Sequence, residues 1–398
     1  MTQPKRLAAA LALAGAAFAA PVHADVTIGL LGGLTGPIAG MAPAMVDSMK
    51  LAVSQVNEQG GIAGGKLNAV VGDSACNPQN ATDAATKAVN VSGAIGIVGP
   101  ACSGAVLAAS NSVTVPAGVL TITSSGTSPQ ISKIDDKDLV FRTVPSDDYQ
   151  GRALARTLKA QGVDKVAIAY VNNDYGKGLA ESFKDEFEAH GGAIAGYAGQ
   201  EDSKASYRSD LAELAKGGAK TLVLFHYGNS AGLTILRQAI ENGFFENFVG
   251  ADGMRDEAMI KTLGSENLST FRASAPMGES GAAFDAFSAG FRAAGGDPNA
   301  TFAATSYDAA FLMALAIEHA GGDKSKLSAS LRAVSSAPGE PILPGEWAKA
   351  KQLIAEGKDI DYKGAAGDHE FDEAGDVPGQ YELFKVSGNT YESITEMK

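Results

Sequence analysis

The sequence predicts an α/β protein made of two similar lobes, each built on a parallel sheet. Short β-branched runs alternate with longer segments of helical periodicity from Asp25 onward, and this alternation is typical of parallel βαβ units. The order strand, glycine loop, helix and Gly-Gly occurs after Asp25 and again after Asp148. The length of 398 residues allows two to three domains of about 150 residues.

The first series begins with a strand predicted over 26–31, followed by a glycine-rich loop. A helix to about Gln59 has apolar residues at helical spacing and ends at Gly60-Gly61, because glycine accepts the left-handed cap. The series continues with a helix through 81–91, a helix from about Ser103, and strands over 67–72, 95–98, 119–123 and 139–144.

The second series and the C-terminal third complete the predicted elements. The second series has helices over 149–161, 179–190 and 231–242 and strands over 166–171, 222–225 and 248–251. The C-terminal third is expected to be mostly helical, over 284–294, 307–320 and 327–334, before a strand over 381–386. Because no low-complexity linker separates the lobes, we expect the chain to cross between them several times.

Residues 1–24 have the pattern of an export signal. Lys5 and Arg6 precede the apolar stretch 7–20, and small residues end the segment where a signal peptidase cleaves. The stretch is short for ~30 Å of hydrocarbon, and no Cys follows to carry a lipid. We expect cleavage after Ala24 and a soluble, exported mature protein. A buried helix or a membrane anchor is the alternative.

The composition argues against several classes of partner and chemistry. A net charge of −13 repels phosphate backbones, so neither nucleic acid nor an anionic membrane surface is expected. The five histidines lack metal-ligand spacing. No serine nucleophile elbow, P-loop lysine pattern or glycine fingerprint after the first strand occurs. We therefore expect no metal, no cofactor and no enzyme activity, with an exported enzyme as the alternative.

The chain has two cysteines, Cys76 and Cys102. In an oxidising compartment such a pair favours a disulfide over a metal pair or a nucleophile. Two free buried thiols are the alternative.

Polar residues follow several of the predicted strands. Ser103 opens a helix, where it could be the N-cap or help to bind an anion. A hydroxyl-rich turn over 123–129 follows the next strand, and Asp252 ends a strand of the second series. Open α/β sheets bind ligands outside the carboxyl ends of their strands. Hydroxyls on one lobe and an acid on the other would suit a zwitterion, although each feature alone also fits a cap or a turn.

Ordered motifs then point to a family. They are Asp-Ser-Ala-Cys-Asn-Pro over 73–78, Gly-Pro-Ala-Cys-Ser-Gly over 99–104, Asn-Asp-Tyr-Gly-Lys-Gly over 173–178, Ser-Tyr-Asp-Ala-Ala over 306–310 and Glu-Phe-Asp-Glu-Ala-Gly-Asp over 370–376. Together with the export signal, this set resembles the periplasmic branched-chain amino acid-binding proteins, the solute receptors of ABC importers. The resemblance covers essentially all of residues 25–398.

The resemblance implies a type I periplasmic binding protein fold. Two doubly wound parallel-sheet lobes would be joined by three crossovers, with the ligand cleft between them. The N-terminal lobe would comprise 25–145 and 275–374, and the C-terminal lobe 146–274 and 375–398. The resemblance also implies that Cys76 and Cys102 are bonded to each other.

The resemblance further implies how a ligand is bound. Ser103 and Thr127, with the backbone around Ser125, would bind the ligand's carboxylate. Asp252 would pair with its ammonium, helped by Tyr175. Neutral hydroxyl and N–H groups can bind a carboxylate without a buried cation, and a desolvated aspartate needs a cationic partner.

Three pocket positions bear on specificity. Met41 occupies the place where leucine-binding relatives usually have a tyrosine, and Asp252 is shorter than their usual glutamate. Tyr227 is expected to form a pocket wall, although the motif near it is shifted by about one residue.

The sequence thus predicts a monomeric periplasmic receptor for a neutral, aliphatic or branched-chain amino acid, delivering it to an inner-membrane ABC permease. The alternative with the same fold binds a small or aromatic carboxylate, or a short amide or urea. A sensory role beside a membrane receptor is a further possibility.

Overall fold

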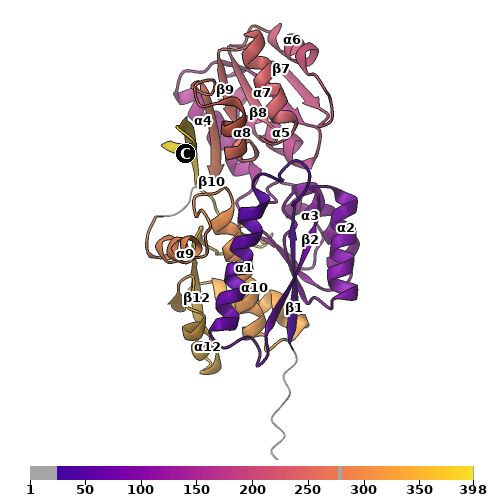
Figure 1. Cartoon of the computed structure of the whole chain (residues 1–398), viewed down its shortest axis with the longest axis vertical. Helices are drawn as coiled ribbons and strands as arrows, with labels where there is room; N and C mark the ends of the chain where they lie inside the picture. The colour runs from indigo at the N-terminus through magenta and orange to yellow at the C-terminus, as the bar shows by residue number, and fades with distance from the viewer. Residues whose placement is uncertain (1–24, 277–279, 398) are drawn as a thin grey trace, which may run out of the picture.

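The computed structural model describes residues 25–276 and 280–397. These residues form two lobes that follow one another along the long axis of the molecule (Figure 1). The predicted export signal, 1–24, lies outside the described residues.

The N-terminal lobe contains a parallel five-stranded sheet of order β2-β1-β3-β4-β5. Its strands are β1 (Val26–Gly32), β2 (Leu67–Asp73), β3 (Gly96–Val98), β4 (Leu120–Thr123) and β5 (Val140–Arg142). All five were predicted. Alternate β1 residues face opposite sides: Ile28 and Leu30 pack with one set of helices, and Leu31 packs with the other. The lobe is therefore covered on both faces, as expected for a doubly wound sheet.

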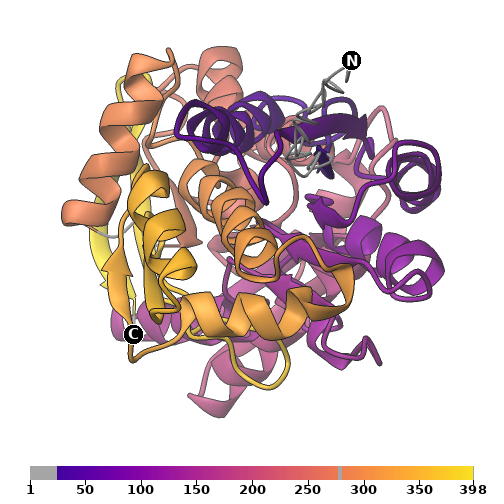
Figure 2. The same cartoon turned by 90° about the horizontal axis from the view of Figure 1, so that it is seen from below.

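Helices α1 (Ala42–Glu58) and α10 (Ala303–His319) cover one face of this sheet, and α2 (Pro78–Thr86) and α3 (Ser103–Ala109) cover the other. One π-helical turn follows each of α2 and α3, over Lys87–Val91 and Ser110–Thr114. Seen from below, α10 lies between α1 and the elements that follow α10 in the chain (Figure 2). Almost every α10 side chain is buried, so this helix is the centre of the lobe.

The C-terminal lobe contains a seven-stranded sheet of order β15-β14-β10-β9-β8-β6-β7. Its strands are β6 (Lys165–Val171), β7 (Ala193–Gln200), β8 (Thr221–Phe225), β9 (Asn247–Gly250), β10 (Phe271–Pro276), β14 (Tyr381–Ser387) and β15 (Thr390–Met397). Strands β6 to β10 run parallel, but β14 and β15 form an antiparallel hairpin against β10. The expected parallel sheet is thus extended at this edge by an antiparallel hairpin.

Five helices pack on this second sheet: α4 (Asp147–Ala160) and α5 (Asp174–Ala189) on one face, and α6 (Arg208–Ala215), α7 (Ala231–Asn242) and α8 (Glu257–Leu263) on the other. The core that contains α4 and α5 continues into the N-terminal lobe through side chains between the two sheets. The lobes thus share one buried contact region.

The chain passes between the two sheets after β5, after β10 and before β14. The elements between the last two passages are α9 (Ala282–Ala293), α10, α11 (Leu327–Ser335), α12 (Trp347–Ala355) and the small sheet of β11 (Glu340–Ile342), β12 (Ile360–Gly364) and β13 (Gly367–Asp368). The residue boundaries of the lobes given above remain a prediction.

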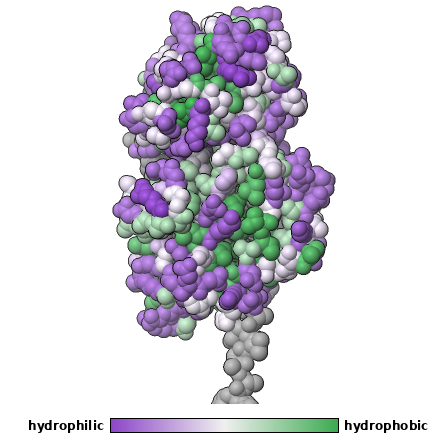
Figure 3. Space-filling view, in the orientation of Figure 1, coloured by the Kyte–Doolittle hydropathy of each residue, from purple (hydrophilic) through white to green (hydrophobic). Residues whose placement is uncertain are grey.

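The face drawn in Figure 3 is largely hydrophilic on the C-terminal lobe, and hydrophobic side chains gather on the N-terminal lobe. Val71 on the edge strand β2 is 45% exposed. Within the described ranges, no helix is long and apolar enough to span a bilayer. Within the same ranges, no three His, Cys, Asp or Glu side chains gather as a metal site would require.

Candidate functional site

A small pocket of about 20 Å³ lies between the two lobes. It contains every residue predicted to bind the ligand except Thr127. The lining residues are Ile38, Met41, Ala101, Cys102, Ser103, Ser125 and Phe302 from the N-terminal lobe, and Tyr175, Tyr227, Asp252 and Gly253 from the C-terminal lobe. The structure therefore brings together residues that are more than 200 positions apart in the chain.

Hydroxyl groups line the N-terminal side of the pocket. The backbone N–H of Ser128 donates to Ser103 Oγ at 3.1 Å, so the Ser103 hydroxyl is oriented by the next loop. Ser125 Oγ donates to the carbonyl oxygen of Ala101 at 2.8 Å. Cys102, rather than Ser103, occupies the N-cap position of α3, so the possibility that Ser103 caps this helix is wrong.

Thr127 lies outside the pocket lining and is fully buried. Its carbonyl oxygen accepts hydrogen bonds from the Asp147 N–H at 2.8 Å and from Arg142 Nη1 at 3.0 Å. Its hydroxyl meets no partner in strict hydrogen-bond geometry among the described residues, but it lies near enough to the Asp147 carboxyl to lower the pKa of that group. In this arrangement Thr127 joins the two lobes behind the pocket.

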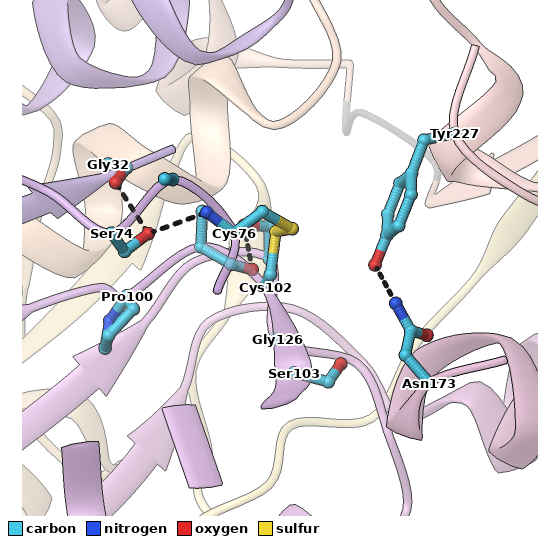
Figure 4. Close-up of a disulfide and its surroundings, with 12 residues drawn as sticks. Gly32, Ser74, Cys76, Pro100, Cys102, Ser103, Gly126, Asn173 and Tyr227 are labelled. Atoms are coloured by element: carbon cyan, nitrogen blue, oxygen red, sulfur yellow. Dashed lines mark hydrogen bonds between the residues drawn. A yellow bond between two sulfur atoms is a disulfide. The ribbon is translucent and has the colours of Figure 1, made fainter. Parts of the chain in front are cut away.

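The C-terminal side of the pocket presents two tyrosines and an acid. The side chain of Asn173, directly before α5, accepts from the Gly176 N–H at 3.0 Å and so caps this helix. Asn173 Nδ2 also donates to the Tyr227 hydroxyl at 3.2 Å. The rings of Tyr227 and Tyr175 stack with their centroids 5.2 Å apart. Figure 4 shows Asn173 and Tyr227 across from Ser103.

Asp252 lies in a 3₁₀ turn directly after β9 and is buried. The Tyr175 hydroxyl donates to Asp252 Oδ1 at 3.1 Å. Burial raises the pKa of Asp252 to about 6, and the hydrogen bond from Tyr175 offsets part of that rise. Within the described ranges, no Lys, Arg or His forms an ion pair with this carboxyl group. The pocket therefore has an acid that a cationic ligand group would stabilise.

The predicted disulfide between Cys76 and Cys102 is confirmed, with the two Cα atoms 5.3 Å apart. It joins the loop after β2 to the start of α3, directly before Ser103 (Figure 4). The loop at Cys76 is further ordered by Ser74 Oγ, which donates to the Gly32 carbonyl oxygen at 2.7 Å. The bond thus fixes one wall of the pocket.

Sequence reasoning missed four residues that line the pocket, Ile38, Ala101, Gly253 and Phe302, and the buried Asp147 beside it. Ile38 and Phe302 line the pocket, and Phe302 has a left-handed backbone with φ of 64°. Neither carries a local sequence signal. Asp147 is fully buried close to Asp252, but in the sequence it looks like an ordinary first-turn acid of a helix capped by Ser146.

The loop that carries Asp252 also contacts the N-terminal lobe. Arg255 Nη1 donates to Thr301 Oγ1 at 2.8 Å and to the Asn299 carbonyl oxygen at 3.2 Å. The Arg255 guanidinium lies 4.4 Å from the ring centroid of Phe384. A second, larger cavity of about 240 Å³ is also lined by Phe302 and contains none of the predicted ligand-binding residues.

Comparison with known sequences gives consistent matches. The family model described as "Receptor family ligand binding region" matches residues 44–389. The chain is 32% identical over 334 residues to the leucine-, isoleucine-, valine-, threonine-, and alanine-binding protein of Pseudomonas aeruginosa, covering 82% of this chain and 87% of that protein. It is 28% identical over 352 residues to an amino acid binding protein of the same organism, covering 86% and 87%.

Solved structures show the same fold. The branched-chain amino acid transporter substrate binding protein LivJ of Streptococcus pneumoniae, solved with isoleucine, has a TM-score of 0.79 and 23% identity, covering 94% of this chain and 99% of that one. A solute binding protein of an R. palustris ABC transporter, solved with benzoate, has a TM-score of 0.76 and 20% identity, covering 94% and 96%. These matches confirm the predicted type I fold.

Proposed function

Because the chain belongs to the family of receptor ligand-binding regions, we propose that it is the solute receptor of an ABC importer and binds a neutral, aliphatic or branched-chain amino acid between its lobes. The observation that carries this proposal is Asp252, a buried carboxyl group in the pocket with no cation in ion-pair contact among the described residues. An unpaired buried acid is costly, and a ligand ammonium supplies its missing partner. The amino acid-binding relatives support the same assignment.

A pocket of about 20 Å³ is too small for an amino acid, so in this proposal the lobes move apart to admit the ligand and close on it as it lies across the pocket. Its carboxylate contacts the Ser103 hydroxyl and the backbone around Ser125, and its ammonium contacts Asp252 beside Tyr175. Thr127 does not contact the ligand in this arrangement, because its side chain lies outside the pocket lining. Its carbonyl oxygen instead accepts hydrogen bonds from both lobes behind the pocket.

The side chain of the ligand lies against the apolar wall formed by Ile38, Met41 and Phe302. An unbranched methionine at position 41 adapts to different aliphatic shapes more readily than a tyrosine ring does. The stacked rings of Tyr175 and Tyr227 close the opposite side. We therefore expect aliphatic amino acids to bind better than charged ones.

An amine-free carboxylate is the second candidate, since one structural neighbour was solved with benzoate. Aromatic lining by Tyr175, Tyr227 and Phe302 favours it. Asp252 argues against it, because a second negative charge beside a buried acid would be repelled.

Isothermal titration calorimetry of protein refolded without ligand tests the proposal. We expect micromolar or tighter binding of an aliphatic amino acid, about −8 kcal/mol, and no comparable binding of benzoate. Asp252→Asn should weaken amino acid binding at least 100-fold, about 3 kcal/mol. The matched control Asp285→Asn removes an exposed acid on α9 and should leave binding unchanged. Equal affinity of Asp252→Asn and the unmodified protein would contradict the assignment.

Export, release to a permease and a monomeric state belong to the same proposal. Cleavage after Ala24 would leave Asp25, which directly precedes β1, as the first residue. N-terminal sequencing of the protein recovered from the periplasm should therefore begin at Asp25.

A further inference from the structure

Beside the pocket, the two lobes touch at positions occupied by glycine. Gly178 is on α5, one turn after Tyr175, and lies against the turn of the N-terminal lobe that contains Pro129. A Cβ atom on Gly178 would lie 2.8 Å from Pro129 Cδ and 3.3 Å from Ser128 Oγ. Carbon atoms do not pack at 2.8 Å without a shift of one of them, so α5 lies this close to the other lobe because residue 178 has no side chain.

The turn that Gly178 contacts is held in place by its own hydrogen bonds. Pro129 is buried, and its ring is part of the backbone. The carbonyl oxygen of Ser128 accepts from Arg142 Nη1 at 3.1 Å. The Ser128 N–H donates to Ser103 Oγ, also at 3.1 Å, and Ser103 lines the pocket. A side chain at position 178 would therefore displace α5 rather than this turn.

A second glycine makes the reciprocal contact from the N-terminal lobe. Gly40 lies in the chain between the pocket residues Ile38 and Met41, and a Cβ atom on it would lie 2.6 Å from Asp256 Oδ2 of the C-terminal lobe. Asp256 is buried, and its other carboxyl oxygen caps α8. Because moving this carboxyl group would cost the cap, it does not readily make room for a methyl group.

A third glycine at the boundary between the lobes has a neighbour that can move. A Cβ atom on Gly104, in α3, would lie 3.0 Å from Asp174 Oδ2. Asp174 is exposed, and the contact is with the far end of its side chain. A methyl group on Gly104 therefore needs only a rotation of that side chain.

We propose that Gly178 and Gly40 are positioning residues for ligand binding, because their lack of a side chain lets the lobes close fully on the ligand. Gly178 sets how closely α5, which carries Tyr175, approaches Ser103. Gly40 sets how closely the loop before α1 approaches Asp256. Neither glycine lines the pocket. The inference rests on the proposed function, because it requires a ligand that binds between lobes that open and close.

Alanine variants titrated with leucine test this inference. The backbones of both glycines lie outside the left-handed region, so alanine can adopt their conformation. Gly178→Ala and Gly40→Ala should each weaken leucine binding at least tenfold in calorimetry, because the fraction of closed protein falls. Dissociation in stopped flow should be faster. In small-angle scattering, leucine should reduce the radius of gyration of either variant less than that of the unmodified protein.

The melting temperature of the ligand-free protein separates closure from folding. Alanine is a better helix former than glycine, so Gly178→Ala should not lower this temperature. A general packing defect would lower it. Pro129→Ala removes the ring that the added methyl group meets. The double variant Gly178→Ala/Pro129→Ala should therefore bind leucine more tightly than the two single effects together predict.

Two helical glycines serve as matched controls. Gly104→Ala adds a methyl group at the same boundary, but against a side chain that can rotate away. Gly290→Ala adds one on α9, where the nearest atom would be Gln55 Nε2 of the same lobe, at 3.2 Å. Both variants should bind leucine within about twofold of the unmodified protein.

The outcomes distinguish this inference from the proposed function. Unchanged leucine affinity in Gly178→Ala and Gly40→Ala would overturn the inference and leave the proposed function standing. Equal losses in these variants and in Gly104→Ala would overturn it as well. If Gly178→Ala does not fold, Gly40→Ala, which changes a loop, decides.

Binding of benzoate and of no amino acid would overturn the proposed ligand class, and the same variants titrated with benzoate would then decide the inference. Binding of neither by the unmodified protein would overturn both.

Discussion

The buried carboxylate of Asp252 is proposed to strengthen ligand binding, but it lowers the stability of the ligand-free fold. Its pKa is raised from 3.8 to about 6 by burial. Below pH 3.8 the group is protonated in both folded and unfolded chains. Between about pH 4 and 6 the folded protein binds more protons than the unfolded chain, so the free energy of unfolding falls as pH rises. Above pH 6 the full cost is present, on the order of 3 kcal/mol.

We therefore expect Asp252→Asn to raise the melting temperature of the ligand-free protein at pH 8 and to have little effect at pH 4. Differential scanning calorimetry at both pH values checks this, with Asp285→Asn as the exposed control. A lower melting temperature of Asp252→Asn at pH 8 would show that the buried acid is stabilised by a group other than a ligand.

Some residues of the site could be predicted from the sequence and others could not. Ser103 and Asp252 were found because they follow strands whose carboxyl ends meet at the pocket. Phe302 was not found, because its position in the pocket depends on the tertiary path of the chain. The chain returns from the C-terminal lobe to the N-terminal lobe before α10, and Phe302 directly precedes that helix. Asp147 was hidden by its own local sequence, which is that of an ordinary capped helix.

At the scale of elements, buried strands were the easiest to predict. The central strands β1, β3 and β8 are continuous apolar runs buried on both sides. Strands β7 and β15 were missed at the edges of the seven-stranded sheet, where exposed residues dilute the apolar pattern. The internal strand β10 was also missed, although it is largely buried. The β14–β15 pairing is set by a hairpin that periodicity alone does not reveal.

The disulfide also gives a prediction at the scale of elements, because it connects the loop that follows β2 to the loop that follows β3. Reduction should lower the free energy of unfolding by about 3 kcal/mol, the chain-entropy value for a loop of this size, since 26 positions separate the two cysteines. It should also weaken ligand binding, because Cys102 lines the pocket. Urea unfolding with and without reductant checks the first effect.

The double variant Cys76→Ser/Cys102→Ser is the control for that experiment. Its unfolding midpoint should be unaffected by reductant and close to that of the reduced protein. A reductant effect of equal size in the double variant would show that the loss of stability has another origin.

At the scale of the whole molecule, binding depends on how the lobes meet. Thr301 Oγ1 accepts from Arg255 Nη1 and donates to the Arg255 carbonyl oxygen, each at 2.8 Å, so one hydroxyl makes two contacts between lobes. Thr301→Val keeps the shape and removes both. We expect ligand affinity to fall about fivefold to thirtyfold, for a loss of about 1 to 2 kcal/mol from the closed state.

The fall in affinity should come mainly from faster dissociation, measurable by stopped flow. Thr262→Val is the matched control, because Thr262 Oγ1 donates only to the Ala258 carbonyl oxygen within α8. Equal effects of the two variants would mean that Thr301 acts on general stability rather than on lobe closure.

The order of elements along the chain also governs when the N-terminal lobe can fold. Its sheet consists of strands that end at Arg142, yet α10, which covers one face of that sheet, begins only at Ala303. Until residues from Ala303 onward have been synthesised, the apolar side of β3 and β4 that α10 covers is therefore exposed to solvent. Such late, long-range contacts slow folding. If the chain is exported as proposed, this delay would prolong the interval in which it has not yet folded.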